Sequence, residues 1–423
     1  MTPGSRFAEG STRRVVITGL GVIAPNGCDL STFWDNVRSG RSAVGPVTRF
    51  NATESPSQLA AEIPNWDPLL YMEAKTAKRS ERSLQYGVAA AVLATRDAGL
   101  DMAKMNPDRA GIVEATSLSN LDAAYRAREA FDARGMRAIT PSMMLSGYVG
   151  SGSAEVASQL GFKGHAITCS SSSASGNDVV GYAMHMIQHE EVDLMLAGGA
   201  EAPLVDTVYF GFAQSRAMTR WSGPPQEAMK PFDERGDGFV MGEAGVYLVL
   251  EELSHALGRG AKIYAEVLAQ SRSCEAYHPM APHPDGWGVA RAMEKAFRVA
   301  RIAPEEVDYI NPHGSANAIN DIAETRAIKT IFGPHARRLA VTSTKPITGH
   351  PLAAAGALEA VICTLAIKNS EIPPTLNLRQ PLTDCDLDYV PHKSRPYPVR
   401  VALNLNSGFG GKTSCMILRR FDG

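Results

Sequence analysis

The sequence predicts an α/β protein made of two similar halves. Apolar, partly β-branched segments of strand length alternate with helical patterns up to residue 251, and the alternation starts again at residue 262. Such alternation is typical of central sheets that are covered by helices. No sequence repeat is visible, so the order of the elements is the only sign of duplication.

The first half opens with a buried strand that runs into a glycine-rich turn within residues 14–27. The turn offers G-x-G-x-x-A, but Pro25 and Asn26 fall where a phosphate-binding helix should continue, so we interpret it as a strand-to-loop turn. The elements predicted after it are helices at 31–39 and 77–98, a strand at 110–113, a helix at 143–161, and strands at 193–200 and 246–251.

The second half repeats this order of elements. It is predicted to contain a helix at 288–301, a strand at 309–311, helices at 320–332 and 350–367, and strands at 401–406 and 414–418. We therefore divide the chain into an N-terminal half, residues 14–260, and a C-terminal half, residues 261–423. Residues 1–13 are small and polar without an apolar core, so we expect a disordered tail and neither a signal peptide nor an anchor.

Composition excludes several classes of protein. The chain has 423 residues, 44% of them hydrophobic, and a formal charge of −2, which is typical of a globular protein and not of a nucleic-acid binder. Six scattered cysteines without a C-x-x-C pair argue against disulfides and against a zinc site, so no metal is expected. No run approaches the roughly 20 apolar residues of a membrane helix. We expect a cytoplasmic protein.

The chemistry is predicted to gather at a serine-rich junction between a strand and a helix. Residues 165–178 read HAITCSSSSASGND, and a side chain in this turn would face a helix N-terminus, which favours developing negative charge. Downstream, His313 and His350 each lie on a glycine-containing turn, and Lys345 stands five residues before the second histidine. A lone histidine of this kind is usually structural, but two with a nearby lysine indicate a catalytic site.

These motifs, in this order, resemble the β-ketoacyl-acyl carrier protein synthases. The resemblance extends from Arg14 to Leu418 and includes the segments VITGLG, LAGGAE, KPFD, DGFV and GFGG together with the two histidine motifs. It implies the thiolase fold, two similar halves packed as five α/β layers. The forms NSGFGG, EAYH and CDLDYVP are similar to those of the aromatic or polyene polyketide branch, in type II systems.

The resemblance also implies a mechanism and its residues. In the family an acyl chain is held as a thioester on a cysteine, and a malonyl unit on a carrier protein is decarboxylated and attacks it. His313 and His350 would carry out decarboxylation and condensation, while Lys345 with Glu359 would orient them. Gly408, Phe409 and Gly410 would form the oxyanion loop, and Ser315 and Asn317 would contact the phosphopantetheine arm. That arm belongs to the carrier protein, so no cofactor of the chain's own is expected.

The position of the nucleophile departs from the family. Matching Gly176 and Gly181 to the family pattern places Ser173 where the cysteine should be, and Cys169 lies four residues earlier inside the strand. No general base beside the serine is evident from the sequence, so self-acylation should be greatly slowed. Three interpretations stay open: a natural ketosynthase with a slow serine, an engineered Cys→Ser form, or a silent partner subunit of the chain-length-factor type. A serine hydrolase is less favoured, because G-x-S-x-G is absent at Ser173.

Expected partners follow from the same resemblance. An acidic acyl carrier protein would dock on basic side chains, and a homodimer or a heterodimer with a chain-length factor is expected, with no nucleic acid and no membrane. The dimer surface is predicted around residues 193–200 and 150–161. The candidate docking residues are Lys75, Lys78, Arg79, Arg82, Arg134, Arg137 and Arg216.

Overall fold

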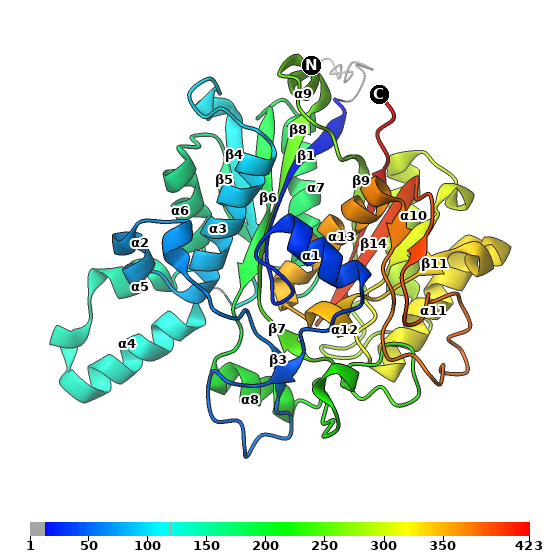
Figure 1. Ribbon diagram of the computed structural model, residues 1–423, viewed down its shortest axis with the longest axis horizontal. Helices are drawn as coiled ribbons and strands as arrows, with labels where there is room; N and C mark the ends of the chain where they lie inside the picture. The colour runs from blue at the N-terminus through cyan, green and yellow to red at the C-terminus, as the bar shows by residue number, and fades with distance from the viewer. Residues whose placement is uncertain (1–12, 119) are drawn as a thin grey trace, which may run out of the picture.

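A computed structural model describes residues 13–118 and 120–423 of the chain. Its main feature is a ten-stranded sheet in the order β11-β10-β14-β15-β9-β1-β8-β6-β4-β5 (Figure 1). The N-terminal half contributes β1 (Val15–Ile23), β4 (Ala110–Ala115), β5 (Ala166–Cys169), β6 (Leu194–Glu201) and β8 (Ala244–Glu252). The C-terminal half contributes β9 (Ala265–Cys274), β10 (Tyr309–Asn311), β11 (Ala340–Val341), β14 (Val401–Gly408) and β15 (Lys412–Arg419).

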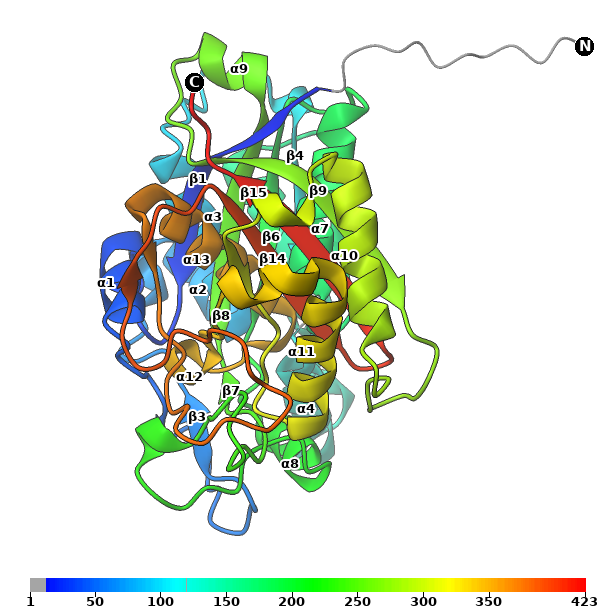
Figure 2. The ribbon, with the colours of Figure 1, turned by 90° about the vertical axis from the view of Figure 1, so that its right-hand side faces the viewer.

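The two five-stranded halves meet along β1 and β9. Only Val16 with Glu266 and Ile17 with Ala265 pair there, in antiparallel register. Two buried helices, α7 (Ser175–Gln188) and α13 (Ala355–Asn369), pack against each other and against strands of both halves. They form the middle layer of the molecule (Figure 2).

The outer faces are covered by further helices. On the N-terminal half, α3 (Arg82–Asp97) packs on β1 and β8, and α6 (Ser151–Leu160) packs on β4 and β5. On the C-terminal half, α10 (Trp287–Ala300) packs on β9 and β15 and against α11 (Ala318–Phe332). The predicted α/β fold of two similar halves in five layers is therefore confirmed.

The shorter elements lie around this core. The remaining helices are α1 (Leu30–Arg38), α2 (Ala74–Arg79), α4 (Leu121–Arg134), α5 (Pro141–Gly147), α8 (Asp206–Gln214), α9 (Leu253–Gly258) and α12 (Lys345–Thr348). Two small sheets contain β2 (Gly45–Pro46), β3 (Leu59–Ala61) and β7 (Met241–Gly242), and β12 (Glu371–Ile372) with β13 (Arg395–Pro396).

Two predicted helices are each divided in the structure. The pattern at 77–98 becomes α2 and α3, because the backbone of Ser80 is extended between them. The pattern at 143–161 becomes α5 and α6, because Tyr148 is extended and Gly150 is the N-cap of the second helix. Both divisions lie at residues with modest or poor helix propensity, which apolar periodicity alone does not reveal.

The predicted dimer surface at residues 193–200 is wrong. This segment is β6, which lies between β8 and β4 and is buried along its whole length. The open edge of the sheet is β5, whose four residues are exposed or half-buried. Beside it, α5 packs on α6, which in turn contacts β5. An unpaired strand edge is the surface at which a sheet can extend into a second chain.

Two further predictions concern the ends and the long apolar helix. Residues 1–12 of the predicted tail lie outside the described residues, whereas the Arg13 guanidinium pairs with Asp193 at 2.7 Å. The expectation that no run approaches the length of a membrane helix is wrong by length and composition, because the segment Leu352–Asn369 meets both criteria; 89% of it is buried inside the protein. It is the core helix of the middle layer.

Candidate active site

Ser173 lies in the turn between β5 and α7. The preceding residue, Ser172, has a left-handed backbone with φ +59°, which turns the chain sharply. The Ser175 hydroxyl accepts from the Ser171 N–H at 2.7 Å and donates to the Ser172 carbonyl at 2.5 Å. These local bonds hold the turn, and Ser173 is left 7% exposed at the wall of a cavity.

His313 follows the buried strand β10. The Glu324 carboxylate, from α11, accepts from the His313 N–H at 2.6 Å and from the Gly314 N–H at 2.9 Å. Ser343 donates its hydroxyl to the Gly314 carbonyl at 2.7 Å. The backbone of the turn that carries the His313 ring is therefore fixed on both sides.

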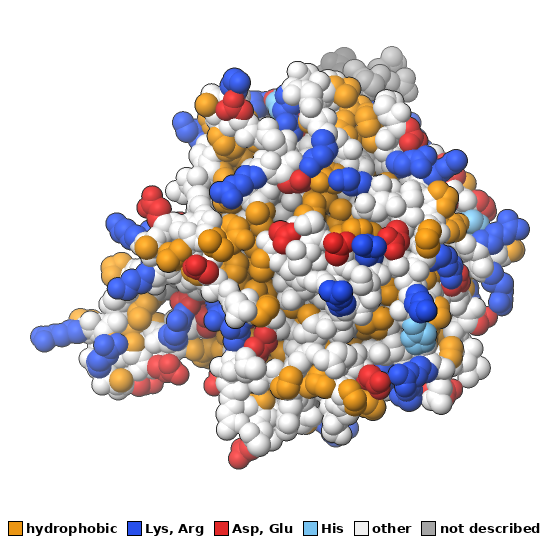
Figure 3. All heavy atoms as spheres, viewed as in Figure 1, with side chains coloured by type: hydrophobic (Ala, Val, Ile, Leu, Met, Phe, Trp, Pro, Cys, Tyr) orange, Lys and Arg blue, Asp and Glu red, His pale blue; other side chains and the backbone are white. Residues whose placement is uncertain are grey.

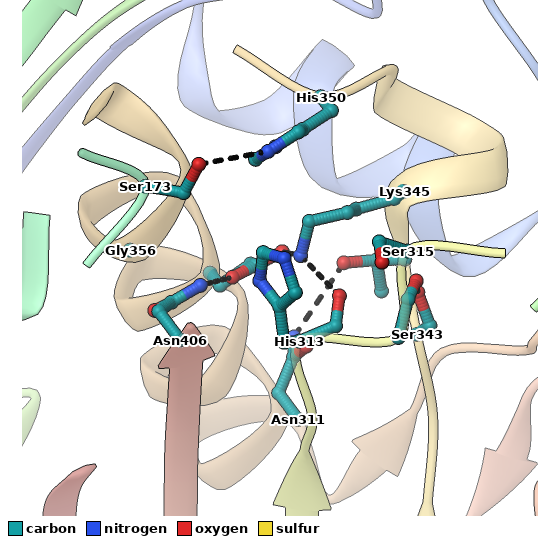
Figure 4. Close-up of polar contacts among 12 residues, drawn as sticks. Ser173, Asn311, His313, Ser315, Ser343, Lys345, His350, Gly356 and Asn406 are labelled. Carbon is teal, nitrogen blue, oxygen red and sulfur yellow. Dashed lines mark hydrogen bonds and ion pairs between the residues drawn. The ribbon is translucent and has the colours of Figure 1, made fainter. Parts of the chain in front are cut away.

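His350 comes from the turn after α12. Its backbone N–H donates to the Val240 carbonyl at 2.8 Å, and its ring meets Phe239 edge to face with the ring centres 5.0 Å apart. The two imidazoles lie 5.4 Å apart between ring centres, and His350 Nε2 is 3.0 Å from Ser173 Oγ (Figure 4). Residues from both halves of the chain thus meet at one point.

Lys345 supports the His313 turn from behind. Its ammonium donates to the His313 carbonyl at 2.6 Å and pairs with Glu359 of α13 at 2.5 Å. The second Glu359 oxygen accepts from the Asn406 amide at 2.6 Å (Figure 4). Lys345 and Glu359 are 0% and 3% exposed, so this ion pair is shielded from water.

Burial shifts the pKa values of the site. Desolvation, followed by the positive charge of Lys345, holds the pKa values of His313 and His350 well below the usual 6.5. Both imidazoles are therefore neutral at pH 7. Burial raises the pKa of Glu324 to about 7, although the two backbone N–H groups that donate to its carboxylate stabilise the charged form. Burial also raises the pKa of Glu359, against the charge of Lys345.

The cavity in front of these residues encloses about 190 Å³. Ser173, His313 and His350 line it together with the predicted binding residues Ser315, Asn317, Gly408 and Phe409. Gly410 is not part of its lining, and its N–H donates to the Pro279 carbonyl at 2.7 Å. Phe409 is 39% exposed and stacks on Phe212, so this pair lies where the cavity meets solvent.

The expectation that Ser173 has no general base beside it is wrong. The sequence places His350 177 residues away, but the turn after α12 brings its Nε2 within hydrogen-bond distance of the hydroxyl. A neutral imidazole can take the proton of a serine that attacks a carbonyl. Cys169, in contrast, ends β5, and burial raises the pKa of its thiol.

None of the candidate docking residues lines the cavity, although Arg216 directly precedes Ala217 of its wall. Lys75, Lys78, Arg134, Arg137 and Arg216 are exposed, whereas Arg79 pairs with Glu155 at 2.8 Å and Arg82 donates to the Tyr86 hydroxyl. Figure 3 shows Lys and Arg side chains mixed with acidic ones over the lobe that α4 forms. Within the described residues no group of histidine, cysteine or acidic side chains is arranged to hold a metal ion.

Two supporting residues were not predicted from the sequence. Asn406 stands inside the NSGFGG motif, directly before the loop that was singled out, so its position was a usable signal. Glu324 had no such signal. It lies 11 residues after His313 within an ordinary helical pattern, and only the packing of α11 brings it to the His313 turn.

Comparison with known proteins agrees with this geometry. Residues 12–256 match the family described as β-ketoacyl synthase, N-terminal domain, and residues 264–379 match its C-terminal domain. The 3-oxoacyl-[acyl-carrier-protein] synthase 2 of Coxiella burnetii is 39% identical over 408 residues, which cover 96% of this chain and 99% of that protein. The Synechocystis protein of the same name is also 39% identical, over 97% of this chain and 98% of that protein.

Two solved structures resemble the whole chain. The ishigamide ketosynthase/chain length factor has a TM-score of 0.91 and 35% identity to this chain, and the match covers 97% of this chain and 100% of the ishigamide chain. The type II polyketide ketosynthase AntDE, in complex with its acyl-carrier protein AntF, has a TM-score of 0.90 and 34% identity over the same shares. From the matched domains, the relatives and the arrangement of the site, we conclude that the chain belongs to the β-ketoacyl synthase family.

Proposed function

We propose that the protein is a carrier-protein-dependent β-ketoacyl synthase of a type II polyketide system, of the aromatic or polyene branch. In this reaction the carboxyl group of a malonyl thioester leaves as CO₂, and the resulting enolate carbon attacks an acyl chain held at position 173. The observation that carries the proposal is the convergence of two buried, neutral imidazoles, 5.4 Å apart, beside Ser173.

Neutral histidines suit the decarboxylation step. Each can donate an N–H to the thioester oxygen as it becomes an enolate, in a cavity where few waters compete. An imidazolium could transfer its proton to the enolate and end the reaction, whereas a neutral ring donates a hydrogen bond and keeps its proton; the depressed pKa values keep both rings neutral at pH 7. The Lys345–Glu359 pair positions His313 through its carbonyl and is not expected to touch the substrate.

Ser173 takes the position of the acyl acceptor in this proposal. It stands at the N-terminus of α7, and its N–H and that of Phe409 would serve as the oxyanion donors. A hydroxyl is a weaker nucleophile than a thiolate and, once acylated, a poorer leaving group. Chain elongation by the serine form is therefore expected to be slow, whether the serine is natural or engineered.

The partners follow from the same proposal. An acyl carrier protein would bring its phosphopantetheine arm past Phe409 to Ser315 and Asn317, and the seven basic residues would receive its acidic surface. The open edge of β5 and the exposed Met136, Leu145 and Val149 in and around α5 favour a dimer, with a second copy or with a chain-length factor. The protein is proposed to work in the cytoplasm.

A silent chain-length-factor-type subunit is the alternative. Such a subunit has no use for a decarboxylation site, yet this chain keeps both histidines, whose rings lie 5.4 Å apart, and the Lys345–Glu359 pair that holds the His313 turn. A buried ion pair is costly to maintain unless both members stay paired. Its retention beside the two histidines favours the catalytic proposal.

Malonyl decarboxylation tests the proposal. Malonyl-loaded acyl carrier protein should lose CO₂ in the presence of the protein, and His313→Asn should slow this by about 10²–10³-fold because one donor to the enolate is lost. His189→Asn is the matched control, since His189 is exposed outside the cavity. A wild-type protein that folds but releases no CO₂ would support the silent-subunit alternative.

A further inference from the structure

The contact between Ser173 and His350 carries a second activity at the same site. The hydroxyl oxygen lies 3.0 Å from His350 Nε2, the serine is 7% exposed and the imidazole 3%. This is the distance at which a general base removes a proton from an attacking nucleophile. We propose that Ser173 and His350 form an acyl-transfer dyad that hydrolyses acyl thioesters carried on phosphopantetheine.

The protonation state of His350 permits this role. The ring is neutral at pH 7, so one of its nitrogens is free to accept a proton. Its other nitrogen, Nδ1, is buried and has no hydrogen-bond partner among the described residues. A partner at Nδ1 would fix which ring nitrogen carries the proton. Because Nδ1 has none among the described residues, either tautomer can form. Nε2 can therefore accept from Ser173 in one reaction and donate to a substrate oxygen in another.

The proposed reaction has two balanced steps. First, Ser173 Oγ attacks the thioester carbonyl and gives its proton to His350 Nε2; the new C–O bond replaces the C–S bond, and the pantetheine sulfur leaves with that proton. Second, water attacks the serine ester and gives a proton to His350 Nε2; the ester C–O bond breaks, and Oγ takes the proton back. The products are a free carboxylic acid, a carrier thiol and the unchanged enzyme.

One nitrogen must serve both functions, and this favours hydrolysis over elongation. The proposed function requires His350 Nε2–H to donate to the malonyl enolate oxygen during condensation. A departing serine alkoxide needs a proton from the same atom at the same moment, whereas a cysteine thiolate would need none. Attack by water uses Nε2 once as a base and then once as an acid. The serine form can complete hydrolysis with the groups that it has.

The cavity has room for the water. It encloses about 190 Å³, and a single water needs about 10–15 Å³ of such space together with polar partners. Polar side chains of its wall, among them Ser315, Asn317 and Thr413, provide such partners. Once the pantetheine thiol has left, water can enter by the same opening beside Phe409.

The inference rests on the proposed function only in assigning acyl thioesters as substrates. The same purified protein can be tested for hydrolysis and for malonyl decarboxylation. Octanoyl-pantetheine is incubated with the protein, intact-protein mass spectrometry follows the octanoyl ester on Ser173, and chromatography follows free octanoate. We expect octanoate release that Ser173→Ala abolishes. Ser173→Cys should also take up the octanoyl group, because a thiolate attacks the carrier thioester without giving a proton to His350.

A variant of the base and a variant outside the cavity test the dyad. His350→Asn should lower octanoate release by about 10²–10⁴-fold, the usual contribution of a general base, whereas His189→Asn, at an exposed residue outside the cavity, should retain it. Thermal unfolding checks that each variant is folded. Equal release by His350→Asn, or release by Ser173→Ala, would overturn the dyad. Malonyl decarboxylation without octanoate release would refute the dyad and leave the proposed function standing.

Discussion

The serine turn and the histidine turns contrast in how the protein holds them. Ser173 follows β5, the exposed edge strand, and its turn is held by hydrogen bonds among neighbouring serines and by Asp178. His313 follows β10, an internal strand with every residue buried, and its turn is held by the carboxylate of Glu324 and the ammonium of Lys345. The same strand–turn–helix plan thus appears once at the surface edge and once in the interior.

This contrast matters because charge costs more in the interior. An ion pair without water is stabilising only while each member keeps its partner, whereas a half-exposed pair is screened by solvent. The C-terminal half therefore couples its chemistry to its stability, and the serine turn can change with little effect on folding. Substitutions in the two halves should separate accordingly.

The largest effect is expected from Glu359→Leu. The substitution leaves the Lys345 ammonium, 0% exposed, without a counter-charge, and it should lower the free energy of unfolding by about 3–5 kcal/mol. Lys345→Met should cost less, because burial already raises the pKa of Glu359 and the remaining carboxyl can hold a proton. Denaturant unfolding measures both.

The double variant provides the control for this pair. Glu359→Leu with Lys345→Met removes both charges, and its stability should recover most of the loss caused by Glu359→Leu alone. If the double variant is as unstable as the single one, the loss comes from packing around α13 and not from an unpaired charge.

The difference between the turns also explains how far the sequence could predict the site. Ser173, His313, His350, Lys345 and Glu359 stand in local motifs, and the structure brings them together. Glu324 supports His313 from another helix and leaves no local pattern. The contact between Ser173 and His350 was missed for the same reason, since it depends on the packing of the two halves.

The fold shows the same limit. The alternation of strands and helices predicted the two-half architecture, because burial on sheets and helices imposes periods that a sequence displays. It did not predict the breaks at Ser80 and Tyr148, nor that β6 is internal and β5 the edge. Strand order depends on long-range pairing, which no local period encodes.

The next effect, on pH dependence, is expected at Glu324. Burial raises its pKa from 4.5 to about 7, so the folded protein holds a proton there that the unfolded chain releases above pH 4.5. The resulting stabilisation is complete below pH 4.5 and is lost as the pH rises through 7, by a total of about 3 kcal/mol. Glu324→Gln cannot titrate and should lack this part of the dependence.

Unfolding of both proteins at pH 5 and pH 8 measures this effect. The difference in unfolding free energy, Glu324→Gln minus wild type, should be more favourable to the variant at pH 8 than at pH 5. Only the wild type loses the stabilisation by the proton as the pH rises. A constant difference across this range would mean that Glu324 is ionised throughout, as a carboxylate held by the N–H groups of His313 and Gly314.

The smallest effect is expected from Asp178→Asn, at the serine turn. Asp178, whose side chain is 16% exposed, accepts from the Ser171 hydroxyl at 2.6 Å and from the Gln270 amide at 2.9 Å, and it pairs with Arg272, whose side chain is 46% exposed. Screening by solvent limits the loss of unfolding free energy to about 1 kcal/mol or less. The Ser171 hydroxyl keeps an acceptor in the amide oxygen of the substituted side chain, so the turn should stay in place. The rate of octanoyl transfer to Ser173 should also fall, by a few-fold.

Arg272→Gln is the matched variant, because it removes the same ion pair from the Arg272 side and leaves the contact between Asp178 and Ser171. A loss of stability as large as that of Glu359→Leu would contradict the distinction between an edge-held and a core-held turn, since it would mean that the serine turn also depends on a buried charge.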